Sequence, residues 1–343
     1  MAQPMVRQVK RGWPDARIII TARIGAMGEV FSRLSEAAEV RPLGKTSGEI
    51  LKNMWRVRRS KPYLFIAPFP SNRWQYSMLA MASGAERKLL HSYPVGSWRT
   101  MRCCVGEKIA AQRGIHDVVQ NLRLLGMLGM NIDEQEAPKF ELTESDRERA
   151  IGMLQSVGIG HDERPIAVHP GSARTVLAEA KRWPPHLYAK LIPQLRERFG
   201  GEVVVLEGPD ELGVAEEIEK HLGSKLKVIR LCGALADAAA VLERCRFYVG
   251  SDSGLGHLAA AVGTAPVTIF APADPDRVCP FGYRHLVVRP SKSCSPCLLY
   301  PFAATRPKIK CSSPACVAEV SVQQVLEAAE KAAANLISSV QQA

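Results

Sequence analysis

Short apolar runs that end in polar, glycine-containing turns recur along the second half of the chain. The runs cover residues 166–169, 202–206, 246–249 and 266–271. Between them lie longer stretches with helical spacing of apolar residues. Apolar runs of this length that alternate with helical patterns predict strand–helix–strand units and a parallel sheet. The expected fold class is therefore α/β.

The turn Asp252-Ser253-Gly254 carries the clearest chemistry, because it joins the apolar run 246–249 to a helix of small residues. Ligands of parallel sheets bind at the carboxyl ends of strands, and a helix start directs N–H groups at an anion. Ser253 and Gly254 permit close approach to a phosphate, whereas the Asp252 carboxylate suits sugar hydroxyls. His257 could donate to a diphosphate. In the alternative interpretation, Asp252 or Ser253 only caps the helix and His257 is structural.

A second turn, Gly171-Ser172, follows the apolar run 166–169. Lys181 comes shortly afterwards and precedes Trp183-Pro184-Pro185, where proline suits the start of a helix. A lysine at that position lies near a phosphate-binding turn. The two turns together predict one site for a molecule that offers both phosphates and hydroxyls, such as a nucleoside-diphosphate sugar.

Five motifs of this half follow one another in a characteristic order. They are His169-Pro170-Gly171-Ser172, Lys181-Arg182-Trp183-Pro184, Gly208-Pro209-Asp210-Glu211, Asp252-Ser253-Gly254 with His257, and Ala271-Pro272-Ala273-Asp274-Pro275. This order resembles the carboxyl-terminal half of family 9 glycosyltransferases, the ADP-heptose:lipopolysaccharide heptosyltransferases. The resemblance extends from about Pro4 to Val325.

The resemblance implies a GT-B architecture, with two facing Rossmann-like domains that contain parallel sheets. It implies an inverting transfer of a heptose-type sugar from a nucleoside-diphosphate sugar, ADP-heptose, to a lipopolysaccharide core or similar glycolipid. The nucleotide sugar would be held by the second domain. The residues expected to bind it are Gly171, Ser172, Lys181, Asp252, Ser253, Gly254 and His257.

The amino-terminal half resembles the family less completely. The segment Trp13–Ile20 resembles the family's second strand, Glu39–Leu43 the strand after it, and Pro62–Ala67 a later strand. On this alignment the family's first strand and its Gly-Asp turn, whose aspartate is thought to act as base, have no counterpart. A competing alignment matches that turn to Ile24–Val30, with Glu29 in place of the aspartate.

The first alignment explains both flanking segments without gaps, and it makes Glu29 an ordinary solvated helix carboxylate. No catalytic base is assigned, so the catalytic residues stay unknown. A nucleotide-sugar-binding protein without transferase activity is therefore the alternative function. A nucleotide-sugar epimerase is disfavoured, because the chain lacks a glycine-rich dinucleotide loop near its start and a Tyr-x-x-x-Lys pair.

Composition predicts an ordinary globular protein with two domains over its 343 residues. We expect an acceptor-side domain over 1–160 that is incomplete at its start, a donor domain over 161–321, and a helix over 322–343 that packs back on the first domain. The chain has no long apolar run and no signal-peptide pattern, which predicts a cytoplasmic protein.

Positive charge is concentrated in the first domain. Residues 1–132 contain 21 Lys/Arg and 8 Asp/Glu, a balance of +13, against +11 for the whole chain. The cations named as candidates are Arg56, Arg58, Arg59, Lys61, Arg73, Arg87, Lys88, Arg99 and Arg102. They suit an anionic glycolipid acceptor or the inner face of the inner membrane, unless they form a merely solvated face. No nucleic-acid-binding motif accompanies them, so nucleic acid is not an expected partner.

Four cysteines form two close pairs around a basic loop: Cys294 with Cys297, and Cys311 with Cys316. This spacing is close to that of a structural zinc site, although free thiols or disulfides are the alternatives. Catalysis itself is expected to need no metal or other cofactor, because the chain offers Lys181 and a helix start to a leaving diphosphate.

Overall fold

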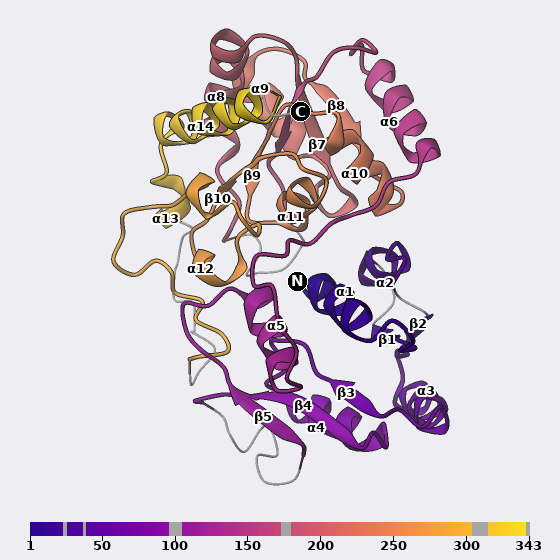
Figure 1. Ribbon diagram of the computed structural model, residues 1–343. Coiled ribbons are helices and arrows are strands. Elements are labelled where there is room, and N and C mark those ends of the chain that lie inside the picture. The colour runs from indigo at the N-terminus through magenta and orange to yellow at the C-terminus, as the bar shows by residue number, and fades with distance from the viewer. Residues whose placement is uncertain (23–25, 37–38, 96–104, 173–179, 304–314, 341–343) are drawn as a thin grey trace. The chain divides into compact units, whose positions relative to one another are not determined.

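The computed structural model describes residues 1–22, 26–36, 39–95, 105–172, 180–303 and 315–340 (Figure 1). The chain forms two compact units. The first contains Met1–Pro138 and a segment that begins at Leu299, and the second contains Lys139–Leu298 and the carboxyl-terminal helix. No helix among the described residues is long and apolar enough to cross a membrane.

The second unit is built on a six-stranded parallel sheet with the order β11-β10-β9-β6-β7-β8. Its strands are β6 (Ile166–His169), β7 (Val203–Glu207), β8 (Lys227–Arg230), β9 (Tyr248–Ser251), β10 (Pro266–Ile269) and β11 (Val287–Val288). From β6 the chain proceeds outward to β7 and β8, then returns to the other side of β6 for β9. The order in which strands are added therefore reverses between β6 and β9, although all strands stay parallel. Ligands of such sheets bind at this switch point.

Helices cover this sheet and complete its core (Figure 1). They are α6 (Glu144–Ser156), α8 (Pro185–Phe199), η2 (Pro209–Glu211), α9 (Val214–Leu222), α10 (Leu235–Glu243), α11 (Gly254–Ala261), α12 (Pro275–Val278), η3 (Arg284–Leu286), α13 (Ala315–Ala318) and α14 (Val322–Val340). The strands β6, β7, β9 and β10 are buried throughout, as expected for a parallel sheet covered on both faces.

The first unit has two smaller parallel sheets, β1-β2 and β3-β4-β5. Its elements are α1 (Gln3–Gly12), β1 (Ile19–Ala22), α2 (Ala26–Ser32), β2 (Glu39–Pro42), α3 (Ser47–Arg59), β3 (Leu64–Ile66), α4 (Trp74–Ala82), β4 (Arg87–Ser92), β5 (Glu107–Ala110) and α5 (Asp117–Gly126). The pairing of β1 with β2 does not distinguish the two alignments. Glu29 lies in helix α2, as the first alignment expects, but it is half-buried and not fully solvated.

The structure divides the chain earlier than the sequence analysis does. Helix α6 was expected in the first domain, but it packs on α10 of the second unit. Its Arg147 bonds Glu243 over 2.8 Å, and its Arg149 bonds Asp237 over 2.9 Å. Because the apolar face of α6 is buried on α10, residues 139–160 belong with the second sheet.

The carboxyl-terminal helix also differs from its expected place. Helix α14 was expected to pack back on the first domain, but it belongs to the second unit, where it packs against α8, β10 and β11. Its Val325, Leu326 and Ala329 are fully buried in the same core as the sheet. An alanine-rich face fits closely onto a neighbouring helix, and α8 provides that neighbour.

Gly250 tests the packing between β6 and β9. A Cβ at this position would lie 2.3 Å from the Tyr248 hydroxyl and 2.7 Å from the His169 carbonyl oxygen. We expect Gly250→Ala to lower the free energy of unfolding by about 1–3 kcal/mol, because the carbonyl is fixed in the sheet. Urea denaturation measures the change.

Gly152→Ala in α6 is the matched control, since a Cβ there meets open space. It should raise the free energy of unfolding by roughly 0.5–1 kcal/mol, as alanine does within a helix. Equal stabilities for the two variants would contradict the packing described here.

Candidate functional site

The two turns that the sequence analysis singled out lie at the carboxyl ends of adjacent strands. Gly171 and Ser172 follow β6, whereas Asp252 and Ser253 follow β9. The Asp252 amide donates to the Ile269 carbonyl over 3.1 Å, which ties the second turn to the end of β10. Both turns therefore meet at the switch point of the sheet.

Lys181 and Asp252 form an ion pair at this point. The Lys181 ammonium lies 2.6 Å from Asp252 Oδ2, and the Asp252 side chain is 7% exposed. Burial raises the pKa of Asp252, and Lys181 opposes that rise by favouring the charged carboxylate. The sequence expectation that these residues converge on one site is consistent with this contact.

Arg182 fixes the first turn, a role that the sequence analysis did not assign. Its guanidinium donates to the Ser172 hydroxyl over 3.3 Å and to the Ser172 carbonyl over 2.5 Å. It also donates to the Asp210 carbonyl over 3.4 Å. Ser172 is buried, and these bonds from Arg182 hold it in place.

Gly171 lies against the Glu211 side chain, whereas the sequence analysis expected it to approach a bound ligand. A Cβ on Gly171 would lie 2.3–2.8 Å from the atoms of the Glu211 side chain. Its lack of a side chain thus accommodates Glu211, in addition to any approach of a ligand. Glu211 comes from η2, which follows β7.

Glu211 belongs to a buried network that includes His169. His169 Nε2 lies 3.0 Å from Glu211 Oε2, and its Nδ1 lies 3.1 Å from the Ser253 hydroxyl and 3.2 Å from the Tyr248 hydroxyl. The Gly208 amide donates to the same Glu211 oxygen over 2.8 Å. Burial raises the pKa of Glu211, but His169 and the Gly208 amide outweigh burial and leave it lowered.

The Ser253 hydroxyl belongs to this network. Ser253 occupies the N-cap position of α11, yet its hydroxyl makes no capping bond to the described helix residues and turns to His169 instead. A Cβ on the next residue, Gly254, would meet open space. The start of α11 is thus open on the side where an anion would bind. His257 lies half-buried in its first turn.

Trp183 holds the segment that carries Lys181. Its backbone N–H donates to the Ser251 hydroxyl over 3.3 Å, and its indole N–H donates to the Val320 carbonyl over 2.9 Å. The ring packs edge-on against Tyr188 in the core. The sequence analysis used Trp183 only as part of a motif, since burial of this kind is decided by distant residues.

The sequence analysis offered four cysteines as a candidate structural metal site. One of them, Cys311, lies outside the described residues. Cys294 is exposed, and Cys297 and Cys316 are half-buried. The described part of the chain contains no group of three metal-ligating side chains. Zinc at these cysteines stays a prediction.

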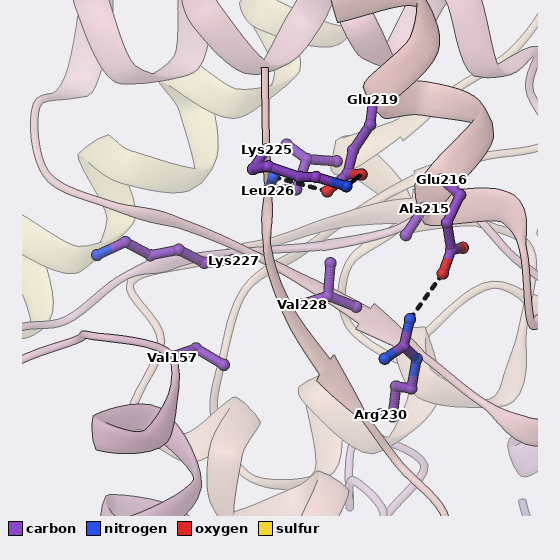
Figure 2. Close-up of a pocket in the computed structure, with 9 residues that line it drawn as sticks. All are labelled: Val157, Ala215, Glu216, Glu219, Lys225, Leu226, Lys227, Val228 and Arg230. Atoms are coloured by element: carbon purple, nitrogen blue, oxygen red, sulfur yellow. Dashed lines mark hydrogen bonds and ion pairs between the residues drawn. The ribbon is translucent and has the colours of Figure 1, made fainter. Parts of the chain in front are cut away.

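A pocket of about 340 Å³ lies away from this site, along β8 and α9 (Figure 2). Its charged groups pair with one another: Arg230 lies 2.6 Å from Glu216, and Lys225 lies 2.7 Å from Glu219. None of the predicted donor-binding residues lines it. Because its charges are already neutralised in pairs, it offers little to a charged ligand.

Comparison with known proteins identifies the class of this site. The profile of glycosyltransferase family 9 (heptosyltransferase) matches residues 89–304, which is more than half of the chain. The chain belongs to glycosyltransferase family 9. It is therefore a glycosyltransferase, and the resemblance read from its motifs is confirmed.

Curated relatives and solved structures agree with this assignment. Lipopolysaccharide heptosyltransferase 3 of Escherichia coli is 24% identical over 290 residues, 80% of this chain and 79% of the relative. Lipooligosaccharide heptosyltransferase 2 of Haemophilus influenzae is 33% identical over 132 residues, 37% of each chain.

Among solved structures, ADP-heptose lipopolysaccharide heptosyltransferase II of Escherichia coli has a TM-score of 0.69 and 18% identity, covering 97% of this chain and 94% of that one. A family 9 glycosyl transferase from Veillonella parvula has a TM-score of 0.79 and 19% identity, covering 97% and 93%. The α/β GT-B fold class is confirmed.

Replacing Lys181 tests the site. We expect Lys181→Met to bind ADP roughly 10- to 100-fold more weakly, because a hydrogen bond to a charged group contributes about 1.5–3 kcal/mol. Titration calorimetry with ADP as the probe measures the affinity. Lys190→Met, on the exposed side of α8, is the control and should bind ADP as the unmodified protein does. Equal affinity in both variants would remove Lys181 from the site.

Proposed function

We propose that this glycosyltransferase moves a heptose from ADP-heptose to a lipopolysaccharide core or similar glycolipid, with inversion at the anomeric carbon. The observation that carries the proposal is the ion pair between Lys181 and Asp252 at the switch point of the second sheet. Family 9 membership and the names of the relatives supply the donor and acceptor classes.

The donor-binding residues divide by chemistry. The open start of α11, with Ser253 and Gly254, and the cation of Lys181 would hold the diphosphate. The Asp252 carboxylate would accept hydrogen bonds from sugar hydroxyls, and Lys181 favours its charged form. Gly171, Ser172 and His257 would complete the cradle.

A leaving diphosphate needs its developing charge neutralised. The positive charge of Lys181 and the backbone dipoles at the start of α11 can neutralise that charge. Both are already in position, so they need no rearrangement during the reaction. We therefore propose that transfer is independent of divalent metal. Direct displacement also needs a base that takes the proton of the acceptor hydroxyl. We assign no residue to that role.

The acceptor would be recognised by positive charge. The first unit carries the excess of Lys and Arg, and phosphates and acidic sugars of a glycolipid core are anionic. We propose that the protein acts in the cytoplasm at the inner face of the inner membrane, where such an acceptor is assembled.

The decisive experiment follows release of ADP from ADP-heptose with and without a heptose-deficient lipopolysaccharide acceptor. We expect acceptor-dependent release, and a loss of at least 100-fold with Asp252→Ala, because that change removes the ligand for the sugar hydroxyls and leaves Lys181 without its partner. UDP-sugars serve as the control donors. Binding of ADP-heptose without its consumption would instead support a nucleotide-sugar-binding protein.

A second measurement addresses the metal. Turnover in excess EDTA should equal turnover in magnesium, because Lys181 and α11 replace the cation at the diphosphate. Loss of turnover in EDTA that magnesium restores would contradict this proposal. The initial rate of ADP release is the measured quantity.

A further inference from the structure

Most of the large apolar side chains that are exposed among the described residues come from the segment of the first unit that contains α3 and α4. Of the eleven large hydrophobic residues that are exposed among the described residues, seven lie between positions 51 and 81. They are Leu51, Trp55, Tyr63, Trp74, Tyr76, Met78 and Met81. Exposed apolar side chains gathered in one region indicate an interaction surface, whereas single ones are ordinary.

Helix α3 has an inward and an outward side. Met54 and Val57 are buried, whereas Leu51 and Trp55, one turn apart, are 68% and 53% exposed. The Arg59 guanidinium lies 3.8 Å from the centre of the Trp55 ring. This cation–π contact holds a positive charge and an aromatic ring together at the surface.

Helix α4 repeats the arrangement and packs beside α3 (Figure 1). Ser77 and Ala80 are buried, whereas Trp74, Met78 and Met81 are exposed at positions that share one side of a helix. The exposed sides of these two helices are called the α3–α4 surface below.

Positive charge surrounds these apolar groups. Between Glu49 and Glu86 the sequence contains six Lys/Arg and no Asp/Glu. The six are Lys52, Arg56, Arg58, Arg59, Lys61 and Arg73, and all are exposed. No acidic side chain neutralises this part of the surface from within the segment.

We propose that the α3–α4 surface docks on a lipid bilayer that carries anionic headgroups. Tryptophan prefers the headgroup level, and Leu51, Met78 and Met81 can enter the acyl boundary. Cations are attracted to anionic headgroups and tryptophan to the interface, so the six cations and two tryptophans supply the two kinds of attraction that stable peripheral binding needs. A purely apolar protein partner would not explain the absence of acidic residues. The inference rests on the proposed function for its location at the inner membrane, but it does not depend on the donor site.

Flotation with vesicles tests the proposal. The full chain should bind vesicles of phosphatidylglycerol and phosphatidylethanolamine, and bind phosphatidylcholine vesicles at least tenfold more weakly. Binding should weaken as salt increases, because salt screens exposed charges. Lipids with brominated acyl chains should quench tryptophan fluorescence of the bound protein.

Two double variants separate the apolar and the charged contributions. Trp55→Ser with Trp74→Ser, and Arg56→Glu with Arg59→Glu, should each lower the vesicle partition coefficient at least tenfold. Leu212→Ser and Lys190→Glu, at exposed positions of the second unit, are the matched controls and should bind as the unmodified chain does. All variants should keep their affinity for ADP, which shows that they are folded.

Three outcomes would overturn the proposal. They are equal binding to anionic and neutral vesicles, unchanged binding by both double variants, and binding only to vesicles that contain the glycolipid acceptor. The last would make this surface part of the acceptor site. Because ADP release is measured separately, failure of membrane docking is distinguishable from failure of the transferase proposal.

Discussion

The pairing of β6 with β9 is the constraint on which the donor site depends. These strands lie far apart in sequence, yet their parallel register places His169 beside Gly250 and brings both following turns to one edge of the sheet. Gly250 has no side chain, which leaves room for the Tyr248 hydroxyl to reach His169 and Ser253. A sheet that did not reverse its order here would separate Ser172 from Asp252.

Two buried carboxylates hold the turns once the strands have brought them together. Asp252 is paired with Lys181, and Glu211 with His169. A buried charge is costly unless it is paired and hydrogen-bonded, so each pair fixes the loop that supplies its partner. His169, the partner of Glu211, also bonds the Ser253 hydroxyl, which makes no capping bond to the described residues of α11.

The two units present different chemistry to solvent. The second unit pairs many of its charges, as in the pocket along β8 and α9, whereas the first unit leaves six cations exposed next to tryptophan and methionine on α3 and α4. Such a surface leaves the packing of the core unchanged, but it exposes apolar area to water. That exposure is reduced when the surface meets a partner, and an anionic bilayer matches both its charge and its aromatic groups.

The sequence by itself determined the α/β class, the strands β6, β7, β9 and β10 of the second sheet, and the family, because apolar runs followed by glycine-containing turns are local features with a fixed order. It also predicted that Lys181 and Asp252 belong to one site. Only the tertiary structure decided that α6 and α14 belong to the second unit. Their apolar faces pack on α10 and α8, and no local sequence signal indicates which helix such a face will meet. It likewise decided the roles of Arg182, His169 and Glu211, because a hydrogen bond between residues of different turns exists only after the sheet has formed.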